Sequence, residues 1–264
     1  MGSEVASDGA RISYTVAGPA GAPVLLFINS IGTTRELWAP QVAACSHTYR
    51  LIRYDARGHG ASSVPGGDYT IEQLGRDALA ILDAERAERA HVCGISLGGL
   101  TAMSLGVRAP QRVASLILAN TAARIGSVQS WTDRMALVRE RGMRSVADLA
   151  IPLWFSSGFA ERHPATLERF RTMIERCPVE GYLGCCAALR DEDLRESISG
   201  IRCPVLAVAG RTDTATPVSA LQDIHDRIAG SHMVTLDASH LSNVEQAEAF
   251  TSAVLAFLAA ASRQ

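Results

Sequence analysis

Five residues in the first half of the chain read Gly94-Ile95-Ser96-Leu97-Gly98. Before them, residues 90–93 form a short apolar run that suits a buried strand. After them, residues 97–108 are rich in Leu, Ala and Met, which favours a helix. The pattern G-x-S-x-G between a strand and a helix predicts a nucleophile elbow, a turn so tight that only glycine fits around its serine.

The elbow predicts a reactive serine. It would hold Ser96 Oγ clear of the sheet and aim the N–H of Leu97 at an oxyanion. The alternative is an ordinary serine in a glycine-rich turn. The stretch resembles the α/β-hydrolase family, which implies an α/β fold with a mostly parallel, doubly wound sheet and an inserted helical cap. A serine at the elbow argues against the epoxide hydrolases and haloalkane dehalogenases of this fold, which carry Asp there.

The composition is that of an ordinary globular protein. The 264 residues are 47% hydrophobic and 20% charged, and the net charge of −2 offers no basic field for nucleic acid or an anionic membrane. All 25 basic residues are Arg, which excludes lysine Schiff-base chemistry. Six cysteines without C-x-x-C spacing and the absence of a signal-peptide pattern favour a cytoplasmic protein. We expect no membrane span, no cofactor and no bound metal.

Strand and helix patterns alternate around the elbow. Apolar runs predict strands at residues 12–16, 24–28, 49–54, 90–93, 113–118, 205–209 and 233–236. Helical periodicity and capping signals predict helices at residues 36–46, 71–84, 97–108, 217–228 and 244–261.

The alternation breaks after residue 130. Four helical segments are predicted there, at residues 131–141, 146–155, 165–176 and 182–189. A helical block inserted into a doubly wound sheet would cover the carboxyl ends of the strands, where such sheets bind ligands. We therefore predict a hydrolase core in two parts, residues 1–124 and 200–264, with a helical cap at residues 125–199.

Two loops carry further family patterns. After the strand at residues 24–28, the chain reads Asn29-Ser30-Ile31, where α/β hydrolases usually have His-Gly and then an oxyanion-hole residue. By position Ile31 is that backbone donor; the alternative is a plain polar loop. Residues 55–62 resemble the family's D-x-R-G-H-G-x-S loop. Because His59 precedes Ser96 whereas this fold runs Ser, acid, His, we interpret His59 as a structural loop histidine.

Asp213 and His240 each follow a late predicted strand, and with Ser96 they give the Ser, Asp, His order of this fold. His240 Nε2 would take the proton from Ser96 Oγ, and Asp213 would hold the imidazole in the required tautomer. Taken singly, Asp213 suits a turn and His240 a loop. Their joint order and position favour a catalytic triad, with Asp237 as the alternative acid.

A narrower resemblance lies in the cap and in the Asn-Ser loop. The chain is similar to the 3-oxoadipate enol-lactonase family at residues 27–33, 120–126, 184–190 and 239–243, and around Trp131 and Arg134. The resemblance runs nearly end to end. It implies hydrolysis of a five-membered enol-lactone that bears a carboxymethyl group, which gives 3-oxoadipate in bacterial aromatic catabolism.

Trp131 and Arg134 are three residues apart, so on a helix they share a face. An arginine fork binds a carboxylate bidentately, and an indole N–H would add one donor. We expect both residues to bind a small anionic lactone; the alternative is a surface arginine beside a half-buried tryptophan. Other enzymes of this fold stay open: a general carboxylesterase, a cofactor-free haloperoxidase or a C–C bond hydrolase. A non-catalytic ligand-binding module is a further alternative, against which the complete triad weighs.

Overall fold

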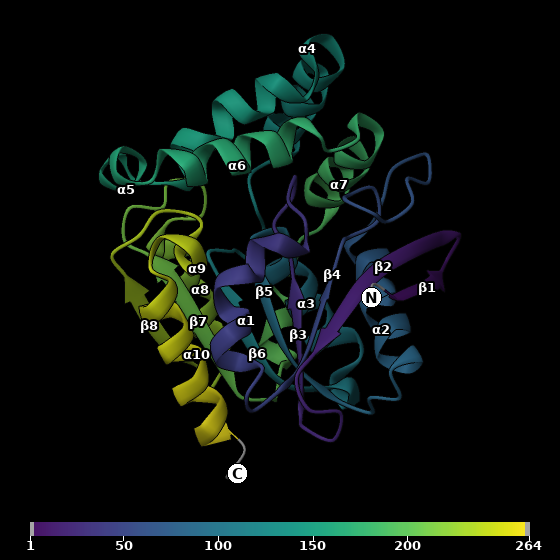
Figure 1. Ribbon diagram of the computed structural model, residues 1–264, viewed down its shortest axis with the longest axis vertical. Coiled ribbons are helices and arrows are strands. Elements are labelled where there is room, and N and C mark those ends of the chain that lie inside the picture. The colour runs from purple at the N-terminus through teal and green to yellow at the C-terminus, as the bar shows by residue number, and fades with distance from the viewer. Residues whose placement is uncertain (1–2, 262–264) are drawn as a thin grey trace.

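One sheet organises the chain in the computed structural model, which describes residues 3–261 (Figure 1). Its eight strands lie in the order β1-β2-β4-β3-β5-β6-β7-β8. Their bounds are β1 Ser3–Ser7, β2 Ala10–Ala17, β3 Val24–Ile28, β4 Arg50–Tyr54, β5 Ala90–Ile95, β6 Val113–Ala119, β7 Val205–Gly210 and β8 His232–Leu236.

The sheet is parallel from β4 to β8 and antiparallel only where β1, β2 and β4 pair. Strand β3 lies between β4 and β5, and all five of its residues are buried. Parallel strands covered on both faces need such continuous apolar runs, which is why they stand out in the sequence. The predicted fold class, a mostly parallel doubly wound sheet, is confirmed.

Helices cover both faces of the sheet and also lie beyond one end of its strands. Figure 1 shows α1 and α10 in front of the sheet and α2 and α3 behind it, while α4 to α7 lie together beyond its upper edge. Among residues 3–261, no helix is both long and apolar enough to cross a membrane. The α-helices are α1 Ala39–Cys45, α2 Ile71–Ala84, α3 Leu97–Arg108, α4 Val128–Trp154, α5 Ser157–Arg162, α6 Pro164–Glu175, α7 Val179–Asp191, α8 Val218–Arg227, α9 Ser242–Glu245 and α10 Ala247–Ala261. Three 3₁₀ turns complete the described elements: Arg35–Trp38, Pro110–Arg112 and Ser197–Gly200.

The helical insertion lies where the alternation of strands and helices breaks. Helices α4 to α7 lie between β6 and β7 in the chain order. Helix α4 includes two predicted helices and departs from helical geometry at Gly142, where φ is +67°. That break falls in the predicted gap between them. The division of the chain at residues 124 and 199 stays a prediction.

The described elements differ from the predicted ones in three places. Strand β1 was not predicted because it is a short, largely polar edge strand, which pairs with β2 across a turn at Asp8 and Gly9. Helix α5 has only six residues, too few for a periodic signal. The predicted helix at residues 244–261 is interrupted at Gln246, whose φ and ψ are −123° and 52°.

Candidate active site

The backbone strain of the elbow lies at one residue, Ser96. Strand β5 ends one residue before Ser96 and α3 begins one residue after it, and Ser96 itself has φ +57° and ψ −119°. A Cβ on Gly98 would lie 2.2 Å from the backbone oxygen of Ile28, so no larger residue fits there. Left-handed backbone at a non-glycine residue costs about 1–3 kcal/mol and persists only where the surrounding fold enforces it. The strand and helix therefore impose the position of Ser96.

The predicted acid and base form a buried pair. His240 Nδ1 donates to Asp213 Oδ2 over 2.9 Å, and the two side chains are 4% and 0% exposed. Thr216 Oγ1 donates to the same carboxylate oxygen over 2.7 Å, and backbone N–H groups of Ala215 and Thr216 bond to Oδ1. This arrangement directs the Nδ1 proton to Asp213 and leaves His240 Nε2 as the free acceptor.

The environment of Asp213 keeps its carboxylate ionised. Burial by itself raises the pKa of Asp213, but the charge and hydrogen bond of His240 and hydrogen bonds from Asn120 and Thr216 outweigh it. The pKa consequently lies below its ordinary value. An ionised carboxylate in this position stabilises an imidazolium on its neighbour. The alternative acid, Asp237, is 82% exposed and faces Arg211 at 3.7 Å.

A cavity of about 230 Å³ brings most of the predicted site residues together. Of the seven, five line it: Ile31, Ser96, Trp131, Arg134 and His240. The other two are buried, Asp213 behind the imidazole and Leu97 at the first position of α3. Within residues 3–261, neither Ile31 N–H nor Leu97 N–H has a hydrogen-bond acceptor. The predicted oxyanion hole requires two backbone donors without an acceptor, and these two meet that requirement.

His59 stabilises the loop that carries Ile31 by a hydrogen bond. Its Nε2 accepts the N–H of Gly32 over 2.9 Å, while its Nδ1 faces the carbonyl of Arg57 at 3.1 Å. Burial lowers the pKa of His59, so the ring is neutral, with its proton on Nδ1. Arg57 in turn makes a buried bidentate pair with Asp77 of α2, at 2.6 and 2.7 Å. These contacts agree with a structural role for His59.

The substrate-binding role expected of Trp131 and Arg134 stays a prediction, and their contacts differ. Trp131 and Arg134 do line the cavity from α4, both half-buried. The indole Nε1–H donates to the carbonyl of Ile125 over 2.6 Å, so in this structure it already has an acceptor within the protein. Sequence spacing places two side chains on one helix face but cannot show that a nearby carbonyl already takes the indole proton.

Arg134 keeps its charge available. Within residues 3–261 no carboxylate forms an ion pair with it, and its polar neighbour is the buried phenol of Tyr182. Burial raises the pKa of Tyr182, so the phenol stays neutral. Tyr182 also lines the cavity and was not singled out from the sequence, since a tyrosine within an apolar helix carries no distinct signal.

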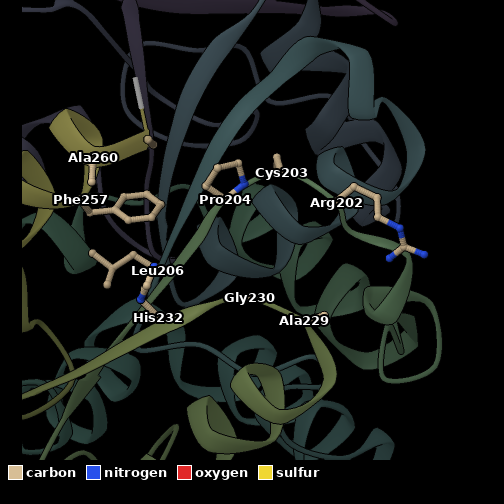
Figure 2. Close-up of a pocket in the computed structure, with 10 residues that line it drawn as sticks. Arg202, Cys203, Pro204, Leu206, Ala229, Gly230, His232, Phe257 and Ala260 are labelled. Atoms are coloured by element: carbon tan, nitrogen blue, oxygen red, sulfur yellow. The ribbon is translucent and has the colours of Figure 1, made fainter. Parts of the chain in front are cut away.

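A second hollow lies at the opposite end of the strands. It measures about 440 Å³ and is lined by residues that begin β7 and β8, including Leu206 and His232, with Phe257 of α10 (Figure 2). Burial raises the pKa of the Cys203 thiol in its wall to about 11, which keeps that thiol protonated at neutral pH. Figure 2 shows the Arg202 side chain extending away from Leu206 and Phe257. The hollow thus has no activated nucleophile among these residues.

In the described part of the chain, no group of three or more His, Cys, Asp or Glu side chains is placed to hold a metal ion.

The chain is similar to proteins of one known family. Residues 23–247 match the family model of the alpha/beta hydrolase fold. The chain is 43% identical to 3-oxoadipate enol-lactonase 2 of Acinetobacter baylyi over 94% of its own length and 92% of that protein. The crystal structure of the enol-lactonase from Burkholderia xenovorans LB400 superposes with a TM-score of 0.96 at 42% identity, covering 97% of this chain and all of that one. A thermophilic esterase from Thermogutta terrifontis superposes with a TM-score of 0.92 at 27% identity, covering 99% of each chain.

Proposed function

The chain belongs to the α/β hydrolase fold family, and from that premise we propose that it opens 3-oxoadipate enol-lactone with water to give 3-oxoadipate. The observation that carries the proposal is the composition of one cavity. Ser96 and His240 line it together with Arg134, a guanidinium without an ion pair in the described chain. A lactone bearing a carboxymethyl group presents an ester carbonyl to the first two residues and a carboxylate to the third.

Acylation uses the free acceptor of the imidazole. Ser96 Oγ attacks the lactone carbonyl while His240 Nε2 takes the hydroxyl proton. The N–H groups of Ile31 and Leu97 hold the oxyanion, and the adjacent amino end of α3 favours negative charge there. Collapse breaks the ring C–O bond and expels an enolate oxygen, a better leaving group than an alkoxide. His240 returns the proton to that oxygen, which stays tethered within the acyl-enzyme.

In deacylation, water is the nucleophile and Ser96 Oγ is the leaving group. His240 takes a proton from water, the hydroxide attacks the acyl carbon, and the Ser96 C–O bond breaks as the proton returns to Oγ. The product leaves as an enol and becomes the ketone by tautomerisation. Because expulsion of an enolate is undemanding, deacylation is expected to limit the rate.

The test is a spectrophotometric assay of enol-lactone loss, run beside a neutral ester of similar size. We expect the lactone to have the higher kcat/KM. A general carboxylesterase is the second candidate, favoured by the likeness to the Thermogutta terrifontis esterase. Equal turnover of both substrates would support that candidate instead.

We also infer a cytoplasmic site of action. All six cysteine side chains are free thiols, which is the ordinary state in a reducing compartment. The reaction would then stand within the bacterial breakdown of aromatic compounds, downstream of the steps that form the lactone.

A further inference from the structure

Asn120 is a strained, buried residue at the carboxyl end of β6. It is fully buried, and its φ of +42° is left-handed. Its backbone N–H nevertheless continues the sheet by donating to the carbonyl of Val208 over 2.9 Å. Asparagine tolerates this conformation better than most residues, but the strain persists only where neighbouring contacts enforce it. The contacts of the Asn120 side chain should therefore show what holds this residue in its strained conformation.

The side-chain amide of Asn120 bonds to both loops of the acid–base pair. Its Nδ2 donates to Asp213 Oδ2 over 3.0 Å and to the carbonyl of Ser239 over 3.1 Å. Its Oδ1 accepts the hydroxyl of Ser242. Ser239 and Ser242 flank His240 in the chain, so one amide ties the catalytic acid to the loop that carries the base.

The packing around this amide leaves no freedom. A Cβ on Gly210, at the end of β7, would lie 2.3 Å from the carbonyl oxygen of Ser239 and 2.8 Å from Asn120 Nδ2, so the glycine makes room both for the loop before His240 and for the amide. Asp213 Oδ2, which accepts from Asn120, is also the oxygen that accepts from His240 Nδ1. Together with the hydrogen bonds from Ala215 and Thr216, the amide therefore holds the carboxylate in its orientation toward the imidazole.

The next residue reaches the nucleophile. Thr121 is fully buried, and its Oγ1 donates to the carbonyl of Ser96 over 2.8 Å. A Cβ on Gly99 would lie 2.6 Å from Thr121 Cβ, so this contact requires the glycine that follows the elbow. Asn120 and Thr121, directly after β6, thus bond to Asp213, to the loop that carries His240 and to the carbonyl of Ser96.

We propose that Asn120 is a positioning residue of this hydrolase, which sets the orientation of Asp213 and of the loop that carries His240. The inference rests on the proposed function, since it assigns this residue a role beside the triad of that reaction. The Asn120 side chain does not line the cavity, so it is not expected to contact the substrate. Loss of Asn120 should then slow the chemical steps and leave substrate binding unchanged.

The chain supplies a matched control in Asn243. It is also fully buried, and its Nδ2 also makes two hydrogen bonds, to the carbonyl of Leu37 at 3.1 Å and to Gln41 Oε1 at 3.3 Å. It lies three residues from His240 but bonds to neither Asp213 nor His240. Asn243→Ala should therefore lower Tm much as Asn120→Ala does, without the same effect on the triad.

The experiment measures Tm, kcat and KM for both variants on the enol-lactone and on a neutral nitrophenyl ester. It also measures the rate at which a fluorophosphonate labels Ser96, a reaction in which an O–P bond forms, fluoride leaves and His240 takes the serine proton. We expect Asn120→Ala to lower kcat and the labelling rate by about 10- to 100-fold, typical of a residue that orients a catalytic group, with KM within about twofold. Asn243→Ala should keep both rates near those of the parent protein.

A second variant covers the case in which Asn120→Ala fails to fold. Asn120→Asp keeps the size of the side chain but places an oxygen against Asp213 Oδ2, so it should lose more kcat than the alanine variant. Parent-like kcat in Asn120→Asp, or equal losses in Asn120→Ala and Asn243→Ala, would overturn the proposal. Labelling of Ser96 needs no lactone, so failure of the parent protein to turn over the lactone would count against the proposed function alone.

Discussion

The two walls of the cavity are built differently. The wall formed by the ends of the strands holds His240, with Asp213 buried directly behind it, and hydrogen bonds from three separate segments meet at this pair. The cap wall, which α4 forms with Trp131 and Arg134, holds Arg134 half-buried, with no ion pair in the described chain. Many contacts from the core thus hold Asp213 and His240 in place, whereas few contacts hold Arg134. Substitutions on the two walls should therefore differ in both size and substrate dependence.

The largest effect is expected at the nucleophile. Ser96→Ala removes the attacking oxygen and leaves the elbow backbone, so the protein should fold with an unchanged Tm. Turnover of every ester and lactone should fall by roughly four to six powers of ten, as in other triads. Near-parental turnover on any substrate would refute the triad and with it the assignment of the strand-end wall.

Asp213→Asn should give the next largest effect. An amide in place of the carboxylate favours the wrong imidazole tautomer, which costs about 10⁴-fold in kcat in a comparable triad. The loss should be equal for lactone and neutral ester, because Asp213 acts behind His240 and away from the substrate. Asp237→Asn is the matched control, since Asp237 is exposed and paired with Arg211. If Asp237→Asn were the crippled variant, the acid would be misassigned.

The strand-end wall was also the more predictable of the two. The apolar runs of β3 and β5 and the glycines around Ser96 follow from burial and steric demands that any such fold imposes. Helices α2 and α3 have the predicted bounds because a threonine cap and the elbow fix where they begin. Strand β1 escaped prediction because an exposed edge strand needs no apolar pattern.

The supporting contacts were less predictable. Asn120 and Thr121 directly follow β6, the same kind of position that revealed Asp213 and His240, but many strand ends carry polar residues with no role. Only the register of β6 against β7 brings Asn120 to Asp213. Likewise, the hydrogen bond from Trp131 to Ile125 depends on the path of the chain into α4, which periodicity does not encode.

The cap wall should respond to the charge of the substrate. If Arg134 binds the carboxylate of the lactone, Arg134→Ala should cost about 2–4 kcal/mol of transition-state stabilisation. This corresponds to a fall of roughly 30- to 700-fold in kcat/KM for the lactone. A neutral ester that does not use the guanidinium should change little. Arg134→Lys should recover only part of the loss, because an ammonium cannot reproduce the bidentate fork.

The neutral ester is the internal control for Arg134. Equal losses on both substrates would make Arg134 a structural residue, for example through its neighbour Tyr182. Unchanged kinetics on both would remove the cap from the recognition of the substrate and leave the serine hydrolase assignment standing.

The smallest effect is expected at Trp131, and it separates the two residues of the cap wall. Because the indole N–H already donates to Ile125, Trp131→Phe removes a hydrogen bond that holds the start of α4 and keeps most of the apolar surface in the cavity. A neutral hydrogen bond contributes about 1 kcal/mol, so Tm should fall slightly and kcat/KM should fall by no more than about fivefold. The loss should be the same for the anionic lactone and the neutral ester, unlike that of Arg134→Ala. A loss confined to the lactone would mean that the indole N–H turns to the substrate carboxylate on binding, and it would return Trp131 to the role that the sequence first suggested.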